Sequence, residues 1–324
     1  MLPRCNRPRI AFGLTFHPLQ SDHEDGSMTA TATKPIRILL QTTILYDEDD
    51  WNINRFSLLR SALAGLRTAD GQPAAEVTAR DREPDAAGND PVLAGIDTSD
   101  YDQLWLIGVD TGGEGGLNQA ECAAITRFRE RGGAIFSTRD HQDLGASLCK
   151  LGGVGRAHFF HSRQPDPDPD RNRRDDPDNP AIDYPNYHSG SNGDVQRVAA
   201  TDPIHPVLER NGTRVGTLPA HPHEGGVGTP PGDPTARVVV TGTSQATNRP
   251  FNIAVAFEPA NGHGRGWAES TFHHFCDYNW DIGAGAPSFV SEPPSDAIRK
   301  NPSLLDDTKK YVANLVAWLG RRPR

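Results

Sequence analysis

One stretch of the sequence decides the expected fold: Gly132-Gly133-Ala134-Ile135-Phe136-Ser137-Thr138-Arg139-Asp140-His141-Gln142-Asp143-Leu144-Gly145. The glycine pair is expected to end one helix, the apolar run after it favours a buried strand, and a second helix is expected to begin near Asp143. A strand followed by a polar turn and a helix is the repeating unit of open α/β sheets, whose ligands bind beyond the carboxyl ends of the strands. We therefore expect residues 138–141 at the working end of a sheet.

The composition indicates a folded protein and argues against two classes of partner. The chain has 324 residues, and 35% of them are hydrophobic. Its net charge is −9 and it has no basic stripe, which argues against a nucleic-acid partner. No apolar run approaches the ~20 residues of a membrane helix. The four cysteines show no paired spacing, as expected for reduced thiols in a cytoplasmic protein. A homo-oligomer stays open.

Strands and helices are expected to alternate through the first 145 residues. The apolar patterns predict strands at 36–44, 75–79, 101–109 and 134–138, and helices over 56–66 and 118–131. Asn118 with Glu121 three residues later predicts a capping box. The alternation predicts a flavodoxin-like, doubly wound α/β fold, with a mainly parallel sheet and helices on both faces.

The second half of the chain is expected to extend this sheet. Strand patterns recur at 195–198, 236–240, 252–257 and 266–272, and the last three have no helix between them, which predicts antiparallel pairs. A closing helix from Ser303 to Leu319 carries one apolar face and should dock on the sheet.

The expected organisation is a single domain over residues 35–320, preceded by a loose extension. Residues 1–34 form that extension, within which Met28 is an alternative start. Residues 162–194 are a Pro/Asp/Arg-rich insertion that cannot build a core of its own. Two interpretations stay open for the insertion: a solvated surface segment, or a lid over the working end of the sheet.

Several short segments, taken in their order, resemble the ThuA-like (trehalose-utilisation) family of the class I glutamine-amidotransferase-like superfamily. They are Tyr101-Asp102 before a Gly-rich loop, Arg131-Gly132-Gly133, Asp202-Pro203-Ile204-His205-Pro206-Val207, His223-Glu224, Gly262-His263-Gly264-Arg265-Gly266 before a strand followed by His273-His274, and the closing helix at 311–319. The resemblance spans most of residues 35–320. It implies the flavodoxin-like fold and a role in carbohydrate metabolism.

The wider superfamily places a catalytic cysteine at the strand-to-helix elbow, commonly followed by Leu-Gly-His-Gln. Laying His141-Gln142 on that His-Gln puts Thr138 in the position of the cysteine. A threonine hydroxyl is a far poorer nucleophile than a thiolate. The resemblance with this departure predicts that the protein is not a glutamine amidotransferase.

Histidine is the strongest chemical signal, because its pKa suits both proton transfer and metal binding. His141 follows the expected central strand and His273 follows the last one, so both should point toward the same end of the sheet, and Glu224 lies in a loop that could reach the same rim. These three residues form the predicted catalytic set. The predicted ligand-binding residues are Arg139, Asp140, Asp110, His274 and Trp280.

A divalent metal is an open alternative to metal-free acid–base chemistry. Among the His, Asp and Glu side chains that could serve, the preferred ligands are His141, His161 and His273. Arg139 and Asp140 would either position a ligand or form a salt bridge that fixes the elbow.

The function expected from the residues and the resemblance is the binding of a small polyhydroxylated ligand, a sugar or keto-sugar, at the carboxyl ends of the strands. The mixture of aromatic and hydrogen-bonding side chains over residues 272–280 suits such a ligand. Chemistry of the hydrolase or isomerase type is the favoured interpretation. The alternative is a non-catalytic binding or assembly module, in which these histidines only cap loops.

Overall fold

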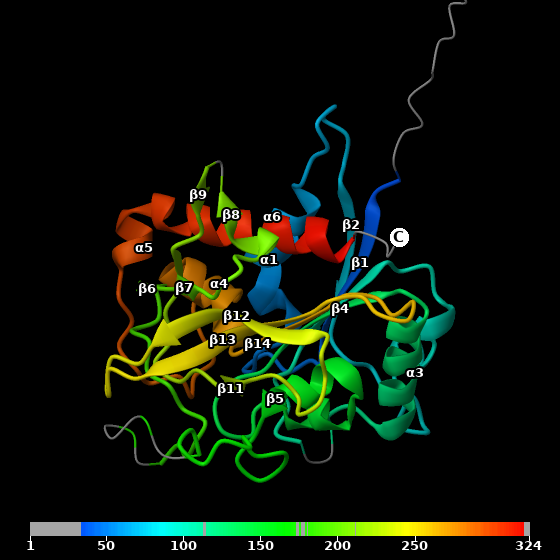
Figure 1. The fold of residues 1–324 in the computed structure, drawn as a ribbon, viewed down its shortest axis with the longest axis horizontal. Coiled ribbons are helices and arrows are strands. Elements are labelled where there is room, and N and C mark those ends of the chain that lie inside the picture. Colours follow the sequence, from blue (N-terminus) through cyan, green and yellow to red (C-terminus); the bar gives the residue numbers. More distant parts are fainter. Residues whose placement is uncertain are drawn as a thin grey trace, which may run out of the picture. The chain divides into compact units, whose positions relative to one another are not determined.

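The structure, a computed structural model, describes residues 34–112, 115–172, 175, 179, 181–210 and 212–320. The predicted extension, up to residue 33, lies outside the described residues. The main sheet has eight strands in the order β2-β1-β3-β4-β14-β13-β12-β7 (Figure 1). In that order the strands are Ala75–Arg80, Ile36–Thr42, Gln103–Ile107, Ala134–Thr138, Gly266–Glu269, Pro250–Phe257, Ala236–Thr243 and Ala199–Ala200.

The sheet is parallel from β2 to β14 and antiparallel beyond it. β4 pairs with β3 on one side and with β14 on the other, both in parallel. The pairs β14–β13, β13–β12 and β12–β7 are antiparallel, as predicted for the second half of the chain. β4, the strand predicted at 134–138, therefore lies in the interior of the sheet, and all five of its residues are buried.

Helices cover both faces of the sheet, so the predicted α/β, flavodoxin-like fold is confirmed (Figure 1). Alternate residues of β3 enter different cores, as strand geometry requires. Trp105 and Ile107 pack in the core that contains α1 (Ser57–Ala64) and α6 (Asp306–Leu319). Leu104 and Leu106 pack in the core that contains α2 (Pro91–Ala94) and α3 (Gln119–Glu130).

The helix starts were predicted with mixed success. The capping box of α3 is confirmed, because Asn118 Oδ1 accepts from Glu121 N (3.0 Å) and Glu121 Oε2 accepts from Asn118 N (2.9 Å). The closing helix begins with a 3-10 turn (η8, Pro302–Leu305), and its α-helical part starts only at Asp306.

The prediction of a helix that begins near Asp143 is wrong. The chain instead forms a 3-10 turn, η3, over Ala146–Lys150. Gly145 has a φ of +83°, which breaks a helix that would start before it. The Asp110 carboxylate then binds the start of the turn, accepting from Ser147 N (3.0 Å) and Ser147 Oγ (2.7 Å).

Short strands form three two-stranded sheets outside the main sheet in the described part of the chain. The predicted strand at 195–198 is β6 (Val195–Arg197), which pairs with β10 (Thr217–Pro219) rather than with the main sheet. β5 (His158–Phe159) pairs with β11 (Gly226–Val227), and β8 (Glu209–Arg210) pairs with β9 (Thr213–Arg214). Two short helices, α4 (Asp277–Trp280) and α5 (Ala297–Lys300), lie in the C-terminal part. Among the described residues no helix is long and apolar enough to cross a membrane.

The described part of the insertion is held to the rest of the protein by charged side chains. Asp166 accepts from Arg171 Nε (2.6 Å) and Nη2 (2.9 Å). Asp175 is buried and accepts from Thr247 Oγ1 (2.7 Å) and Arg249 Nη1 (3.2 Å). The Asp166–Arg171 pair lies within the insertion, whereas the Asp175 contacts join the insertion to the turn between β12 and β13.

Candidate metal-binding site at the carboxyl end of the sheet

A cavity of about 550 Å³ lies at the carboxyl ends of the parallel strands. Residues after four of these strands line it: Trp51 after β1, Thr111 after β3, Asp140 to Leu144 after β4, and His273 after β14. The remaining lining residues are Ile182, His221, His223, Phe289, Val290 and Glu292. The expectation that the elbow after β4 would sit at the working end of the sheet is confirmed for Asp140 and His141.

A glycine allows a second loop to approach this elbow. Gly225 lies between β10 and β11, and a Cβ built on it would be 2.3 Å from the Asp140 carbonyl oxygen. Gly225 N also donates to Ser270 O (3.1 Å). Because no side chain larger than hydrogen fits there, the loop that carries His221 and His223 can lie against Asp140.

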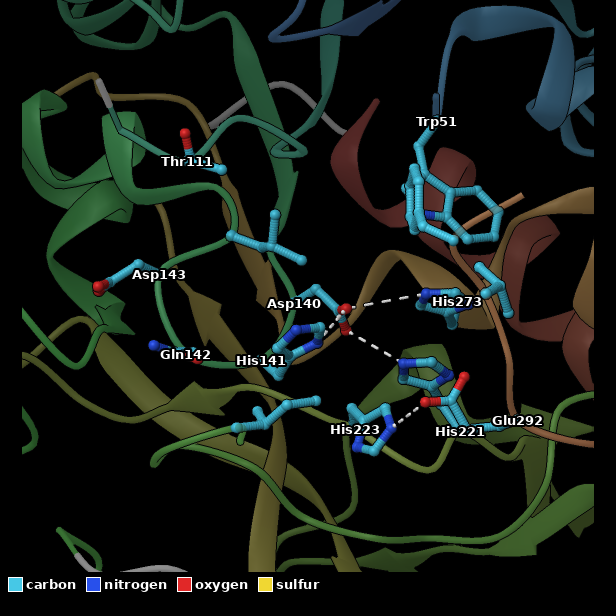
Figure 2. A pocket seen from close by; sticks show the side chains of 14 residues that line it. Trp51, Thr111, Asp140, His141, Gln142, Asp143, His221, His223, His273 and Glu292 are labelled. Carbon is cyan, nitrogen blue, oxygen red and sulfur yellow. Dashed lines mark hydrogen bonds and ion pairs between the residues drawn. The ribbon is translucent and has the colours of Figure 1, made fainter. Parts of the chain in front are cut away.

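The Asp140 carboxylate is the centre of the site (Figure 2). Its Oδ1 accepts from Thr271 Oγ1 (2.7 Å), and its Oδ2 accepts from His141 Nδ1 (2.9 Å). His221 Nε2 lies 3.6 Å from Oδ1, and His273 Nε2 lies 3.8 Å from Oδ2. These last two separations are longer than hydrogen bonds.

A chain of amide groups fixes the tautomers of His221 and His273. Asn279 Nδ2 donates to the Ala220 carbonyl (2.8 Å), which can only accept, so Asn279 Oδ1 must face His273 Nδ1 (2.9 Å). Asn279 Nδ2 also donates to Asn192 Oδ1 (3.0 Å), and the same oxygen faces His221 Nδ1 (2.8 Å). Both histidines therefore carry hydrogen on Nδ1, and in the neutral rings Nε2 keeps its lone pair.

Burial keeps both rings neutral. It lowers the pKa of His221 to about 4 and the pKa of His273 well below its ordinary value. Burial would raise the pKa of Asp140, but the neighbouring histidines and the His141 hydrogen bond hold it well below its usual range. At neutral pH two imidazole lone pairs and a carboxylate therefore face one another, with ligand atoms within 4.8 Å.

Such a set of acceptors is unfavourable unless a cation lies between them. His221 Nε2 is buried and has no hydrogen-bond partner among the described residues. The His221 and His273 rings are stacked, with centroids 3.5 Å apart and planes 8° apart, so both nitrogens approach Asp140 from the same side. Two neutral imidazoles and one carboxylate are a common donor set for a divalent ion in catalytic sites.

His223 and Glu292 form a second polar pair beside this centre (Figure 2). His223 Nε2 lies 3.0 Å from Glu292 Oε1, and its Nδ1 lies 3.1 Å from Asn186 Oδ1. Burial lowers the pKa of His223. Burial would raise the pKa of Glu292, but backbone hydrogen bonds and His223 lower it. The His223 ring also meets His141 and His221 edge-on, with centroids 5.5 and 5.6 Å away.

The predicted catalytic set is only partly brought together. His141 and His273 both contact Asp140 in the cavity. Glu224 instead lies in the core, where it accepts from Ser270 Oγ (2.8 Å) and faces His274 Nε2 (3.5 Å). Glu224 and His274 are both buried, and neither lines the cavity.

Arg139 and Asp110 form hydrogen bonds within the loops around the cavity and do not line its wall. The Arg139 guanidinium is fully buried, lies 4.3 Å from the centroid of the Phe160 ring, and donates to the Gln142 carbonyl. Burial lowers its pKa to about 9. Asp110 accepts from the backbone and hydroxyl of Ser147, as described above. Neither residue is among those that line the cavity.

Trp280 and His161 also lie outside the cavity lining. Trp280 Nε1 donates to the His274 carbonyl (2.8 Å), and the His161 ring packs 5.0 Å from that of Tyr184. The predicted metal set of His141, His161 and His273 is therefore not the one whose ligand atoms converge. Asp140 and His221 take part with His273, and His221 was missed as a ligand. Its only signal was the histidine-rich segment at 221–224.

The elbow carries no activated nucleophile among the described residues. Thr138 is buried, and its Oγ1 has no hydrogen-bond partner there. Burial raises the pKa of Cys122 to about 12 and raises that of Cys276 further. Cys276 Sγ donates to Asn279 Oδ1 (3.0 Å) beneath His273.

Comparisons with known proteins give structural likeness alone. No protein-family model and no curated protein matches the sequence. Similar solved structures include a protein of Bacteroides uniformis described as ThuA-like (TM-score 0.39, 10% identity, covering 89% of this chain and 95% of that one). Another is the glutaminase domain of Trypanosoma brucei CTPS (TM-score 0.41, 14% identity, 89% and 98%). A third is the cytoplasmic protein STM3548 of Salmonella typhimurium (TM-score 0.44, 9% identity, 88% and 99%).

Proposed function

We propose that the protein is a metal-dependent hydrolase of a small polyhydroxylated ligand, with a divalent cation held by Asp140, His221 and His273. The observation that carries the proposal is the pair of Nε2 lone pairs fixed toward one carboxylate by an amide chain. The nitrogen–oxygen separations of 3.6 and 3.8 Å are close to the ~3.3 Å between ligand atoms of a tetrahedral zinc site. Hydrogen bonds that fix the outer ring nitrogen are the usual support of metal-bound histidines.

The residues around the centre fit hydrolysis. When bound, the cation would activate water and polarise the bond to be cleaved. His141 donates Nδ1–H to Asp140, which leaves its Nε2 able to accept the proton of the attacking water. His223, held by Glu292, lies next to His141 and is placed to return a proton to the leaving group.

The shape and lining of the cavity support a small ligand with hydroxyl groups. A volume of about 550 Å³ falls in the usual range for ligand pockets. Trp51 and Phe289 offer aromatic surface, and Thr111 and Gln142 offer hydrogen-bonding groups. This mixture suits the CH faces and hydroxyl groups of a sugar.

Metal analysis of the purified protein tests the proposal. After dialysis against zinc, the wild type should retain about one ion per chain, and His221→Ala and His273→Ala should retain far less. His263→Ala, at a histidine in the turn between β13 and β14, is the matched control and should bind as the wild type does. Hydrolysis of 4-nitrophenyl acetate should disappear with a chelator and return with zinc.

Two outcomes would decide against this function. Wild type that retains no zinc, or ligand variants that retain as much as wild type, would remove the metal site. Zinc binding without hydrolysis of any acyl ester or amide would favour the non-catalytic binding module.

A further inference from the structure

We propose that the ligand hydrolysed in the cavity is uncharged or positively charged, and that the cavity rejects phosphorylated and carboxylated ligands. This inference rests on the proposed hydrolase function and names its substrate class. It follows from the charges of the cavity wall. The described lining residues include the carboxylates of Asp140, Asp143 and Glu292, whose three negative charges outnumber the two positive charges of the proposed cation, and they include no lysine or arginine.

Glu292 brings a negative charge close to the proposed reaction centre. Its carboxylate lies 3.0 Å from His223 Nε2 (Figure 2), and its side chain remains one-third exposed (33%). No lysine or arginine among the described lining residues stands beside this carboxylate. An anionic substituent on a ligand would meet this carboxylate.

Asp143 adds a second negative charge at the other side of the cavity. Its carboxylate accepts from Ser162 N (2.9 Å) and from Ser162 Oγ. Figure 2 shows Asp143 and Glu292 on opposite sides of Asp140. A ligand that spans the cavity is therefore flanked by carboxylates at both ends.

Two arginines lie behind the wall and do not reach into the cavity. Arg139 interacts electrostatically with Asp140 and Asp143, but it is fully buried against Phe160 and does not line the cavity. Arg55 donates to the carbonyl groups of Asp50, Glu48 and Gly285, and it lines a separate hollow. Phosphate and carboxylate ligands are normally bound by arginine or lysine, which can form charge-assisted hydrogen bonds with them.

The same wall suits the products of acyl hydrolysis. The water oxygen bonds to the acyl carbon, the bond from that carbon to nitrogen or oxygen breaks, and the leaving amine or alcohol receives a proton. The acid product then loses a proton and becomes a carboxylate, which Asp143 and Glu292 repel. An amine product becomes an ammonium ion, which the same carboxylates tolerate.

A charge series of one reaction tests the inference on the zinc-loaded full chain. The substrates are acetyl-, glycyl- and succinyl-4-nitroanilide, whose acyl groups are neutral, cationic and anionic, with 4-nitrophenyl phosphate as a dianion. We expect kcat/KM for the succinyl compound to be about tenfold lower than for the acetyl compound. The glycyl compound should be hydrolysed at least as well as the acetyl compound, and the phosphate should not react.

Variants separate wall charge from other causes. The double variant Glu292→Gln/Asp143→Asn should bring the ratio of kcat/KM for the acetyl compound to kcat/KM for the succinyl compound toward one, whatever the overall rate. Glu258→Gln, which removes a half-exposed carboxylate that does not line the cavity, should leave the ratio unchanged. A succinyl compound that is hydrolysed as fast as the acetyl compound, or a ratio that the double variant does not move, overturns the inference.

Binding gives the same ordering without turnover. The rise in Tm caused by each compound should follow glycyl and acetyl above succinyl, and greater stabilisation by the succinyl compound overturns the inference. Zinc stoichiometry, measured first, tests the proposed function by itself. A chain that binds no zinc but keeps this charge ordering would remove the hydrolase function and leave the charge selectivity standing.

Discussion

His273 and His274 are neighbours in the chain, yet the fold places them in opposite chemical environments. His273 lines the cavity, with Nδ1 held by Asn279 and Nε2 facing Asp140. His274 is turned into the core, where Nδ1 lies 2.9 Å from Glu269 and Nε2 lies 3.5 Å from Glu224. The His273 ring therefore faces an amide oxygen and the Asp140 carboxylate, whereas the His274 ring faces two carboxylates.

The two environments leave one ring neutral and the other positively charged. Burial lowers the pKa of His273, which keeps it neutral and able to bind a metal. Burial alone would also lower the pKa of His274, but Glu224 and Glu269 together raise it to about 9. The neighbouring side chains therefore decide whether a buried histidine stays neutral and can bind a metal, or becomes a cation. Glu269 also accepts from Tyr311 Oη (2.9 Å), so the His274 cluster ties β14 to α6.

The largest expected effect comes from removing the cation of the core cluster. His274→Ala leaves the buried Glu224 and Glu269 without their positive partner, and we expect it to lower the free energy of unfolding by about 3 to 5 kcal/mol. His273→Ala, measured without metal, should cost only about 1 to 2 kcal/mol, since it removes no paired charge. Urea unfolding in the presence of a chelator measures both.

For zinc binding the order of the two variants should be reversed, with the larger loss in His273→Ala. His273→Ala should lose zinc binding, while the fraction of His274→Ala that folds should keep it. Equal stability losses in the two variants, or loss of zinc in both, would contradict the distinction between the two histidines.

Much of the fold could be predicted because it depends on local patterns. A fully buried strand such as β4 appears as a short apolar run after a glycine pair, and a capping box needs only residues 118 and 121. The positions of Asp140 and His273 also followed, because the carboxyl ends of parallel strands share one edge of the sheet.

The rest of the site depends on which way each loop residue points, and sequence order does not give that direction. Glu224 forms a bridge with Tyr187, through backbone hydrogen bonds of 2.9 and 2.8 Å. In such an extended segment successive side chains point to opposite sides. His221 and His223 therefore face the cavity, while Glu224 faces the core. A one-residue change of register would exchange them, so the catalytic role predicted for Glu224 had no local signal against it.

The insertion shows a similar limit. Its composition allowed either a solvated segment or a lid. In the described part, Ile182 lines the cavity and Asp175 is buried against Arg249. The contacts that hold the insertion lie some 70 residues away in the sequence, at 247 and 249, where nothing in the local pattern points back to it.

A smaller effect is expected from the amide that sets the tautomer of His273. Asn279→Ala removes the acceptor of Nδ1–H and the donor to Asn192, so both imidazoles lose the support that holds Nε2 toward Asp140. Loss of such outer partners typically costs 10- to 100-fold in metal affinity, and we expect about that here. Zinc titration with a competing chelator measures it.

Asn314→Ala is the control, because it removes amide hydrogen bonds at a position away from the proposed metal site. Asn314 lies on α6 and donates Nδ2 to the Val207 and Glu209 carbonyls, away from the cavity. Asn314→Ala should reduce stability without changing zinc affinity. If Asn279→Ala binds zinc as tightly as Asn314→Ala, the amide chain does not position the ligands.

The smallest expected effect concerns a third buried histidine, His158, which no amide oxygen or carboxylate of the described residues holds. His158 Nε2 lies 2.8 Å from Ser137 Oγ, and its Nδ1 has no hydrogen-bond partner within the described part of the chain. Burial and, to a smaller extent, the charge of Arg139 lower its pKa to about 3. The unfolded chain, with a histidine pKa near ~6.5, therefore binds this proton more readily than the folded chain between about pH 3 and 6.5.

Because the unfolded state takes up the proton, stability should fall as the pH decreases through that window. We expect His158 to cost about 1 to 2 kcal/mol between pH 7 and pH 5, which His158→Gln should remove. The sign is opposite for His274, whose raised pKa gives stability that is present below about pH 6.5 and is lost as the pH rises through about 9. Urea unfolding of wild type and His158→Gln from pH 5 to pH 7 measures the difference in slope. Parallel curves for the two proteins would show that His158 is already protonated in the folded state, and burial without a charged partner would then not be enough to keep a histidine of this fold neutral.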